Sequence, residues 1–313
     1  MVYLLHRYFG REGRDDADEM LMRHSGDEDN PRILGAFNEE TPDWLSFFMF
    51  TYFTDRDGKY QLASLRESAF DPLSRTCDFM LKEEAYHMFV GATGVGRVVQ
   101  RTLDLMREHD TDDVQPLGGL NLGLLQKYIN FHYSVSLDLF GSETSTNAAN
   151  YFGAGIKGRF QEERRNDDHQ LKTVYRNVPH FDENGVGLRE VTQLAALNET
   201  LRDDYAEDCQ KGLDRWNRAT ADAGVDVTFT LPHAGFHRQV GTFRDAYISP
   251  TGQSISKSEW SGNVGRWLPT DADRAYVKSL MVGVTKLGEM AGWVAPPSRG
   301  IHQKPVEYDY VQL

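Results

Sequence analysis

Apolar residues recur at helical spacing through the first 140 residues and predict four amphipathic helices there. Two of these helices have clear starting signals. Thr41-Pro42-Asp43 offers an N-cap with proline in the first turn, and Asp71-Pro72 offers a similar start. Gly118-Gly119 separates the third helix from the fourth. The expected helices span residues 1–24, 41–65, 71–106 and 120–140.

The pattern changes after residue 140. Residues 141–158 are rich in Gly, Ser, Thr and Asn, and fit either a loop or a helix of small residues. The pattern as a whole predicts an all-α helical bundle over residues 1–178, with a C-terminal region, residues 179–313, that packs with it as one unit. In the second half we expect helices at 158–176, 188–223 and from Thr270 to just before Pro296, a strand-like piece at 225–230, and a β-hairpin at 247–255.

Composition and charge narrow the class of protein. The 313 residues carry a formal net charge of −13, and nucleic acids and anionic membranes favour net Lys and Arg, so neither is expected as the main partner. Cys77 and Cys209 form no CxxC pair, which argues against a disulfide framework, a zinc ribbon and a cysteine-ligated iron–sulfur cluster. There is no visible signal peptide, and the longest apolar stretch, residues 44–53, is about half of a bilayer span. We therefore expect a cytoplasmic protein.

The first residues have an unusual pattern for the start of a chain. Apolar positions fall on one helical face from Met1 onward, and no Ser, Thr, Asp or Asn precedes them as an N-cap. One interpretation is that the sequence begins in the middle of a helix. An ordinary frayed terminal helix explains the same pattern.

One Glu-x-x-His motif lies in the middle of the third expected helix, at Glu84-Ala85-Tyr86-His87. Residues three apart share a helical face, so the Glu84 carboxylate and the His87 imidazole can bind one ion together. Such a pair suits iron or manganese. Glu83, four residues before His87, is an alternative ligand to Glu84. The interpretation without a metal is a surface acid beside a partly buried histidine.

Asp55 strengthens the metal hypothesis. It lies on the same helical face as Trp44, Phe48 and Thr51, so its side chain is expected to point inward. A buried carboxylate is unfavourable unless it is paired, protonated or bound to a metal. Asp55 precedes Glu84 by the length of an antiparallel helix pair, which brings both to a similar depth. The alternative is that residues 55–59 form a polar turn in which Asp55 faces water.

The segments around these residues, 47–59 and 79–91, resemble the oxygenase components of benzoyl-CoA 2,3-epoxidases, and the similarity covers essentially the whole chain. The resemblance implies a ferritin-like di-iron bundle. It makes Asp55, Glu84 and His87 the ligands of one iron, with Glu84 bridging, and no other catalytic residue is assigned. It also implies that the first carboxylate and first Glu-x-x-His of the family lie upstream of Met1, so the sequence is expected to be N-terminally truncated and to carry half of the site.

The implied reaction is an epoxidation. Two irons would activate O₂, with electrons from a separate reductase that holds FAD and an iron–sulfur cluster and uses NADPH. One oxygen atom would enter the ring of benzoyl-CoA as a 2,3-epoxide, and the other would form water. Two alternatives remain open. Either the chain acts on another aryl acyl-CoA, such as phenylacetyl-CoA, or it is a metal-free helical subunit that binds a partner.

A CoA thioester carries phosphates, which require Arg or Lys. Other sequence motifs give weaker evidence for a functional site than the Glu84–His87 pair. His233 and His237 have i, i+4 spacing, but a positioned loop or a substrate contact fits the flanking Pro and Gly better than a metal site. Residues 166–169 are expected to form a solvated helical face, and residues 91–96 supply small side chains for close helix packing.

The candidate substrate-binding residues for the CoA phosphates are Arg56, Lys59, Lys157 and Arg159, with Arg164 and Arg165 as further options.

Overall fold

The computed structural model describes residues 2–22, 35–283 and 290–298, and it divides into two compact units, residues 1–40 and 41–313. The smaller unit contains α1 (Val2–Tyr8) and α2 (Gly10–Met22). The single helix predicted over residues 1–24 is therefore wrong. Gly10 has a φ of +67°, which is left-handed backbone that interrupts a helix. The polar break predicted at residues 25–31 lies outside the described residues.

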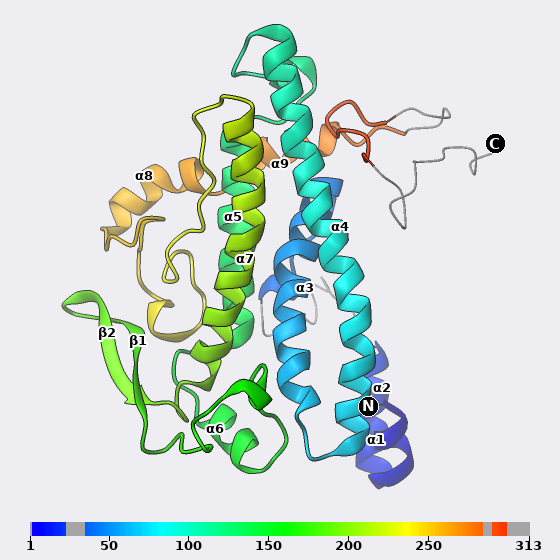
Figure 1. The fold of residues 1–313 in the computed structure, drawn as a ribbon, viewed down its shortest axis with the longest axis vertical. Coiled ribbons are helices and arrows are strands. Elements are labelled where there is room, and N and C mark those ends of the chain that lie inside the picture. The colour runs from blue at the N-terminus through cyan, green and yellow to red at the C-terminus, as the bar shows by residue number, and fades with distance from the viewer. Residues whose placement is uncertain (1, 23–34, 284–289, 299–313) are drawn as a thin grey trace. The chain divides into compact units, whose positions relative to one another are not determined.

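Four helices form the body of the larger unit: α3 (Trp44–Arg66), α4 (Asp71–His109), α5 (Leu122–Leu137) and α7 (Leu197–Asp222). The helix α3 packs against α4, α5 and α7, and α7 also packs against α4 (Figure 1). Together with the limited strand content, this arrangement confirms the predicted helical bundle. None of the described helices combines the length and apolar character that a bilayer crossing requires.

Asp43, and not Thr41, is the N-cap of α3. Its carboxylate accepts a hydrogen bond from the backbone N–H of Ser46 at 2.6 Å, which satisfies a donor of the first turn. Pro42 therefore lies outside the helix, so the predicted proline in the first turn is wrong. The residues that follow are mostly buried, and α3 continues without a break to Arg66. The polar turn considered at residues 55–59 is thus helical.

A close crossing joins α3 to α4. A Cβ atom on Gly91 would lie 2.5 Å from the backbone nitrogen of Tyr52 and 2.8 Å from the carbonyl oxygen of Phe48. Only a glycine allows the two backbones to approach this closely. The prediction that residues 91–96 permit close helix packing is confirmed at this position.

The core of the larger unit is rich in aromatic residues. Tyr52 is fully buried, and its hydroxyl donates to the carbonyl oxygen of Cys209 on α7 at 2.8 Å. The ring of Tyr133 on α5 stacks on that of Tyr205 on α7, with centroids 5.9 Å apart. These contacts join α3, α5 and α7 around one apolar centre.

The middle of the chain differs from the sequence-based expectation. The helix predicted over 158–176 is wrong, because residues in this region form turns and a short 3₁₀ helix, Glu162–Arg164. Its charges pair across the loop: Arg159 binds both Glu162 and Asp167. Before this loop, residues 141–158 contain the short helix α6 (Thr146–Gly153).

A β-hairpin of β1 (Tyr175–Asp182) and β2 (Gly185–Thr192) follows. The two strands are antiparallel, with Asp182 opposite Gly185. The predicted helix over 188–223 is therefore wrong in its first part, and α7 begins at Leu197. Asn184-Gly185 is a turn signal that, between two strand-forming runs, indicates a hairpin.

The predicted strand at 225–230 is wrong. The side chain of Asn217 binds the backbone N–H and carbonyl of Phe229, at 2.7 and 2.9 Å, and so takes the place of a partner strand. The hairpin predicted at 247–255 is reduced to a single antiparallel bridge between Ile248 and Ser254.

Two short helices follow, α8 (Lys257–Trp267) and α9 (Asp271–Ser279). Thr270 caps α9 in a capping box with Asp273, as predicted. The predicted continuation to Pro296 is wrong, because α9 ends at Ser279. The helix α8 was not predicted, although Ser256 and Glu259 form a capping box at its start. The division of the chain at residue 178 stays a prediction.

Candidate metal centre

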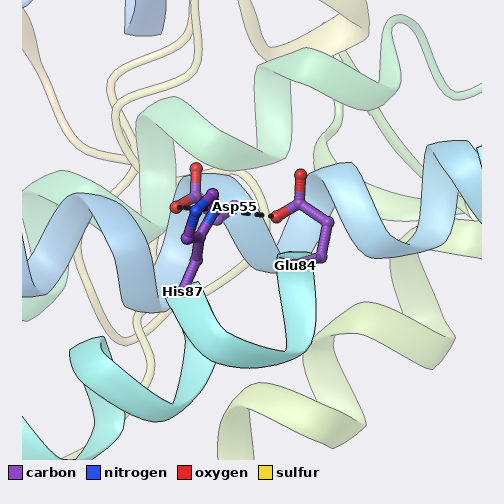
Figure 2. Close-up of side chains that lie close together, drawn as sticks. All are labelled: Asp55, Glu84 and His87. Atoms are coloured by element: carbon purple, nitrogen blue, oxygen red, sulfur yellow. Dashed lines mark ion pairs between the residues drawn. The ribbon is translucent and has the colours of Figure 1, made fainter. Parts of the chain in front are cut away.

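The structure brings Asp55, Glu84 and His87 together between α3 and α4 (Figure 2). One potential ligand atom from each residue lies within 4.8 Å of the other two. The His87 Nδ1 atom lies 3.5 Å from Asp55 Oδ2 and 3.7 Å from Glu84 Oε2. Within the described residues, no other group of three His, Cys, Asp or Glu side chains meets this criterion.

Helix geometry explains why these residues meet. Asp55 lies eleven residues before the end of α3 at Arg66, and Glu84 lies thirteen residues after the start of α4 at Asp71. At a rise of 1.5 Å per residue, the two positions differ in depth by about 3 Å. His87 is one turn beyond Glu84 and shares its helical face.

The electrostatics of the site favour a bound cation. Burial raises the pKa of Asp55, although His87 opposes the shift. Burial also raises the pKa of Glu84, and the charge of Asp55 raises it further. The Glu84 Oε2 atom is buried and has no hydrogen-bond partner among the residues that the structure describes. Two close carboxylates with an orphaned oxygen are stabilised by a positive charge between them.

The chemistry of the donor set fits iron or manganese, because two carboxylates and an imidazole suit these ions. Both cysteines are buried, and neither belongs to the group. The three residues therefore fit a non-haem iron ion. Their assignment as ligands stays a prediction.

The outer side of the site is open. The His87 side chain is 51% exposed, whereas those of Asp55 and Glu84 are 19% and 15% exposed. Large apolar side chains of α4 are also exposed on either side of His87. We call this surface the α4 apolar face; it consists of Phe79, Met80, Tyr86, Phe89 and Val90.

Sequence reasoning missed the burial of Asp57. This residue is 4% exposed, and burial raises its pKa to about 8, although its hydrogen bond to Gln61 opposes the shift. The carboxylate of Glu84 adds to the increase. Because α3 continues through residues 55–59, Asp57 points into the protein. The sequence did not indicate the burial of Asp57, because runs of charged residues usually face water.

Arg56 and Lys59, two of the candidate substrate-binding residues, share one carboxylate on α7. Arg56 Nη1 lies 2.7 Å from Asp208 Oδ2, and Lys59 Nζ lies 2.8 Å from the same atom. The Arg56 side chain is buried and its guanidinium lies over the Tyr52 ring, 4.4 Å from the centroid. The two cations thus connect α3 to α7, and their substrate role stays a prediction.

Lys157 and Arg159, the other two candidates, lie in the loop after α6. Burial lowers the pKa of Lys157, although the charge of Asp57 opposes the shift. Arg159 is buried and forms ion pairs with Glu162 and Asp167. It lines a small cavity of about 120 Å³ that also contacts Arg165. Arg164 remains exposed beside Glu163, and a substrate role for this loop stays a prediction.

The weaker sequence motifs, at His233, His237 and residues 166–169, do not belong to the candidate metal centre. His233 Nδ1 accepts a hydrogen bond from the backbone N–H of Gly235, and His237 lines a separate cavity. The helical face predicted at 166–169 is wrong, because Asp168 and His169 have positive φ. The His169 Nδ1 atom lies 3.0 Å from Glu162 Oε1.

The fold and the site define a helical-bundle protein with a carboxylate–histidine candidate metal centre between two antiparallel helices. No family model matches the chain. The chain is 56% identical to benzoyl-CoA oxygenase component B of Aromatoleum evansii over 316 aligned positions, which cover all of this chain and 67% of that protein. The chain belongs to the family of benzoyl-CoA oxygenase component B.

Proposed function

We propose that this protein is the oxygenase component of a multicomponent monooxygenase that converts benzoyl-CoA to its 2,3-epoxide. Two observations support the proposal. The related protein is named as a benzoyl-CoA oxygenase component, and Asp55, Glu84 and His87 form a group whose composition suits iron. The meeting of these three side chains is the observation that carries the metal assignment.

The three residues would hold iron through the Asp55 and Glu84 carboxylates and the His87 Nδ1 atom, which faces both of them. Iron bound in this way supplies redox chemistry with O₂. The Asp55 and Glu84 carboxylates would balance the charge of the ion, and Glu84 is the expected bridging ligand because its Oε2 atom, although 3.7 Å from His87 Nδ1, has no hydrogen-bond partner among the described residues. The packed apolar side chains of α3 limit the access of water from the inner side.

We propose that this group is one half of a ferritin-like di-iron site. In such bundles two helices each contribute a lone carboxylate and two others each contribute a Glu-x-x-His pair. The helices α3 and α4 supply one carboxylate and one pair. A second set would be carried by helices that pack against the α4 apolar face, next to the half-exposed His87. The large exposed apolar side chains of this face are consistent with such a covering.

The overall reaction balances with two electrons and two protons. One atom of O₂ enters the aromatic ring, and the other leaves as water. The designation of the relative as a component implies further components. We propose a reductase that carries FAD and an iron–sulfur cluster and draws its electrons from NADPH.

The metal assignment is tested by substitution of His87 by Ala in a polypeptide extended to the length of the relative. We expect iron loading at one of the two positions to be lost, together with epoxide formation. If both irons still bind and epoxidation continues, the ligand assignment is wrong. Incubation with benzoyl-CoA and with phenylacetyl-CoA, followed by product analysis, identifies the acyl group.

A metal-free helical subunit that binds a partner is the second candidate function, and the exposed α4 apolar face favours it. Metal analysis separates the two candidates. If the chain is extended to the length of the relative, the proposed oxygenase is expected to bind about two irons per chain. The 313-residue chain, with half of the proposed ligands, is expected to bind close to none. An extended chain that binds no iron supports the metal-free subunit.

A further inference from the structure

A second cavity lies away from the metal centre, between the loop at 237–247 and α8 (labelled in Figure 1). Its volume is about 330 Å³. None of its lining residues belongs to α3 or α4, which carry Asp55, Glu84 and His87. This size is at the lower end of ordinary ligand pockets and suits a nucleotide-sized group.

Aromatic rings form the walls of the cavity. Trp260 on α8 stacks with the imidazole of His237, with centroids 6.2 Å apart and planes 14° from parallel. The ring of Tyr247 lies 6.0 Å from that of Trp260. All three side chains are partly buried, and burial lowers the pKa of His237, which favours the neutral ring. Flat aromatic groups of this kind bind the faces of nucleobases by stacking.

Hydrogen bonds anchor the loop that carries His237 and Tyr247. Asp138 accepts a hydrogen bond from Arg238 Nε at 2.5 Å and another from the backbone N–H of Gln239 at 2.8 Å. His237 has a φ of +52°, a backbone conformation that residues other than glycine rarely adopt. The anchored neighbours fix His237 in this conformation at the edge of the cavity.

Two arginines at the cavity differ in their partners. Arg238 is 2% exposed, and its guanidinium is occupied by Asp138 and by backbone carbonyl oxygens. Arg244 is exposed, and its guanidinium has no hydrogen bond or ion pair with any residue in the described part of the chain. A guanidinium without a protein partner at the rim of an aromatic cavity is suited to a phosphate group.

We infer that this cavity binds the adenosine-phosphate end of the CoA thioester substrate. The adenine ring would stack against Trp260 and Tyr247, and Arg244 would bind a phosphate. Asp245, which also lines the cavity, offers an acceptor for the amino group of adenine. This inference rests on the proposed function, because the acyl-CoA substrate comes from that proposal.

The test measures binding of CoA and of adenosine 3′,5′-bisphosphate to the chain by isothermal titration calorimetry. Both are expected to bind at one shared site, and adenosine 5′-monophosphate is expected to bind more weakly. Arg244→Ala should raise the dissociation constants of CoA and the bisphosphate at least about tenfold, because a charged hydrogen bond to phosphate is lost. Arg266→Ala is the matched control, since Arg266 is an exposed arginine of α8 outside the cavity.

Trp260→Leu should also weaken binding, because a stacking face is removed. Trp260 packs on Phe236, so circular dichroism is used to check the fold of this variant. Unchanged binding in Arg244→Ala, equal binding of adenosine 5′-monophosphate and CoA, or no binding to the unaltered chain would each overturn the inference. Iron loading and epoxide formation are measured separately, so an active Arg244→Ala enzyme with an unchanged KM refutes this site while the proposed function stands.

Discussion

At the scale of single residues, His132 shows how burial makes stability depend on pH. It is a buried residue of α5, and burial lowers the pKa of its imidazole to about 3. The unfolded chain binds the proton near the ordinary value of about 6.5. Stability is therefore unaffected by this group above about pH 6.5, and it falls as the pH decreases toward 3.

We predict that His132→Leu makes the free energy of unfolding less sensitive to acid. Between pH 6.5 and pH 5 the unaltered protein should lose about 1.6 kcal/mol relative to the variant. Urea unfolding at a series of pH values measures the difference. The control is His109→Leu at the exposed end of α4. Parallel pH curves for the unaltered protein and His132→Leu would mean that His132 is accessible to protons in the folded state.

The shared carboxylate of Asp208 gives a second prediction. It binds the buried Arg56 and the more exposed Lys59. Asp208→Asn leaves the Arg56 charge buried without its counterion, so the free energy of unfolding should fall by about 3 kcal/mol. Lys59→Met should cost less, because the pair between Arg56 and Asp208 remains. Chemical denaturation checks both, and equal small losses in the two variants would contradict a structural role for Arg56.

At the scale of elements, the crossing of α3 and α4 fixes the depth of the metal centre. Gly91→Ala would bring a Cβ atom to 2.5 Å from the backbone of Tyr52, so the helices must move apart. We predict a loss of about 1–3 kcal/mol in the free energy of unfolding.

Gly123→Ala is the matched control for this crossing. Gly123 lies within α5, and no atom of the described part of the chain lies within 4 Å of the Cβ that would be added there. The substitution should stabilise the protein by about 0.4–1 kcal/mol. Thermal unfolding compares the variants. A Gly91→Ala protein as stable as Gly123→Ala would show that the close crossing is not required.

The elements also show what the sequence predicts well. Long helices such as α4 repeat their apolar positions over many turns, so their presence was predictable although their ends shifted. After residue 157 the prediction failed for several elements whose structure depends on tertiary partners, although most of α7 and the capped start of α9 were predicted. Asn217 replaces a partner strand for Phe229, and Arg159 holds a charged loop that resembles a helix in sequence. The helix α8 carried a readable capping signal at Ser256.

The candidate site was more predictable than the fold around it. The i, i+3 spacing of Glu84 and His87 requires only that α4 is helical, and the meeting with Asp55 requires only an antiparallel neighbour. The burial of Asp57 could not be read from the sequence, because it depends on how α7 and the loop after α6 cover α3. The cavity at Trp260 joins a loop and a helix whose contact no local pattern encodes.

At the scale of the whole molecule, the chain belongs to the family of benzoyl-CoA oxygenase component B and spans 67% of the length of the relative that it matches. The larger unit holds two distinct features, the carboxylate–histidine group between α3 and α4 and the aromatic cavity beside α8. We propose that the carboxylate–histidine group carries the oxygen chemistry and that the aromatic cavity binds the CoA nucleotide.

The central claim is that Asp55, Glu84 and His87 bind iron. It is tested most directly by the iron content and the epoxide yield of the extended protein with either Glu84→Gln or Glu83→Gln. The two glutamates are neighbours, but only Glu84 faces the candidate centre, while Glu83 is exposed. Glu84→Gln is expected to lower iron affinity at least about tenfold and to abolish epoxide formation, whereas Glu83→Gln should match the unaltered protein. Full iron loading and activity in Glu84→Gln would contradict the assignment.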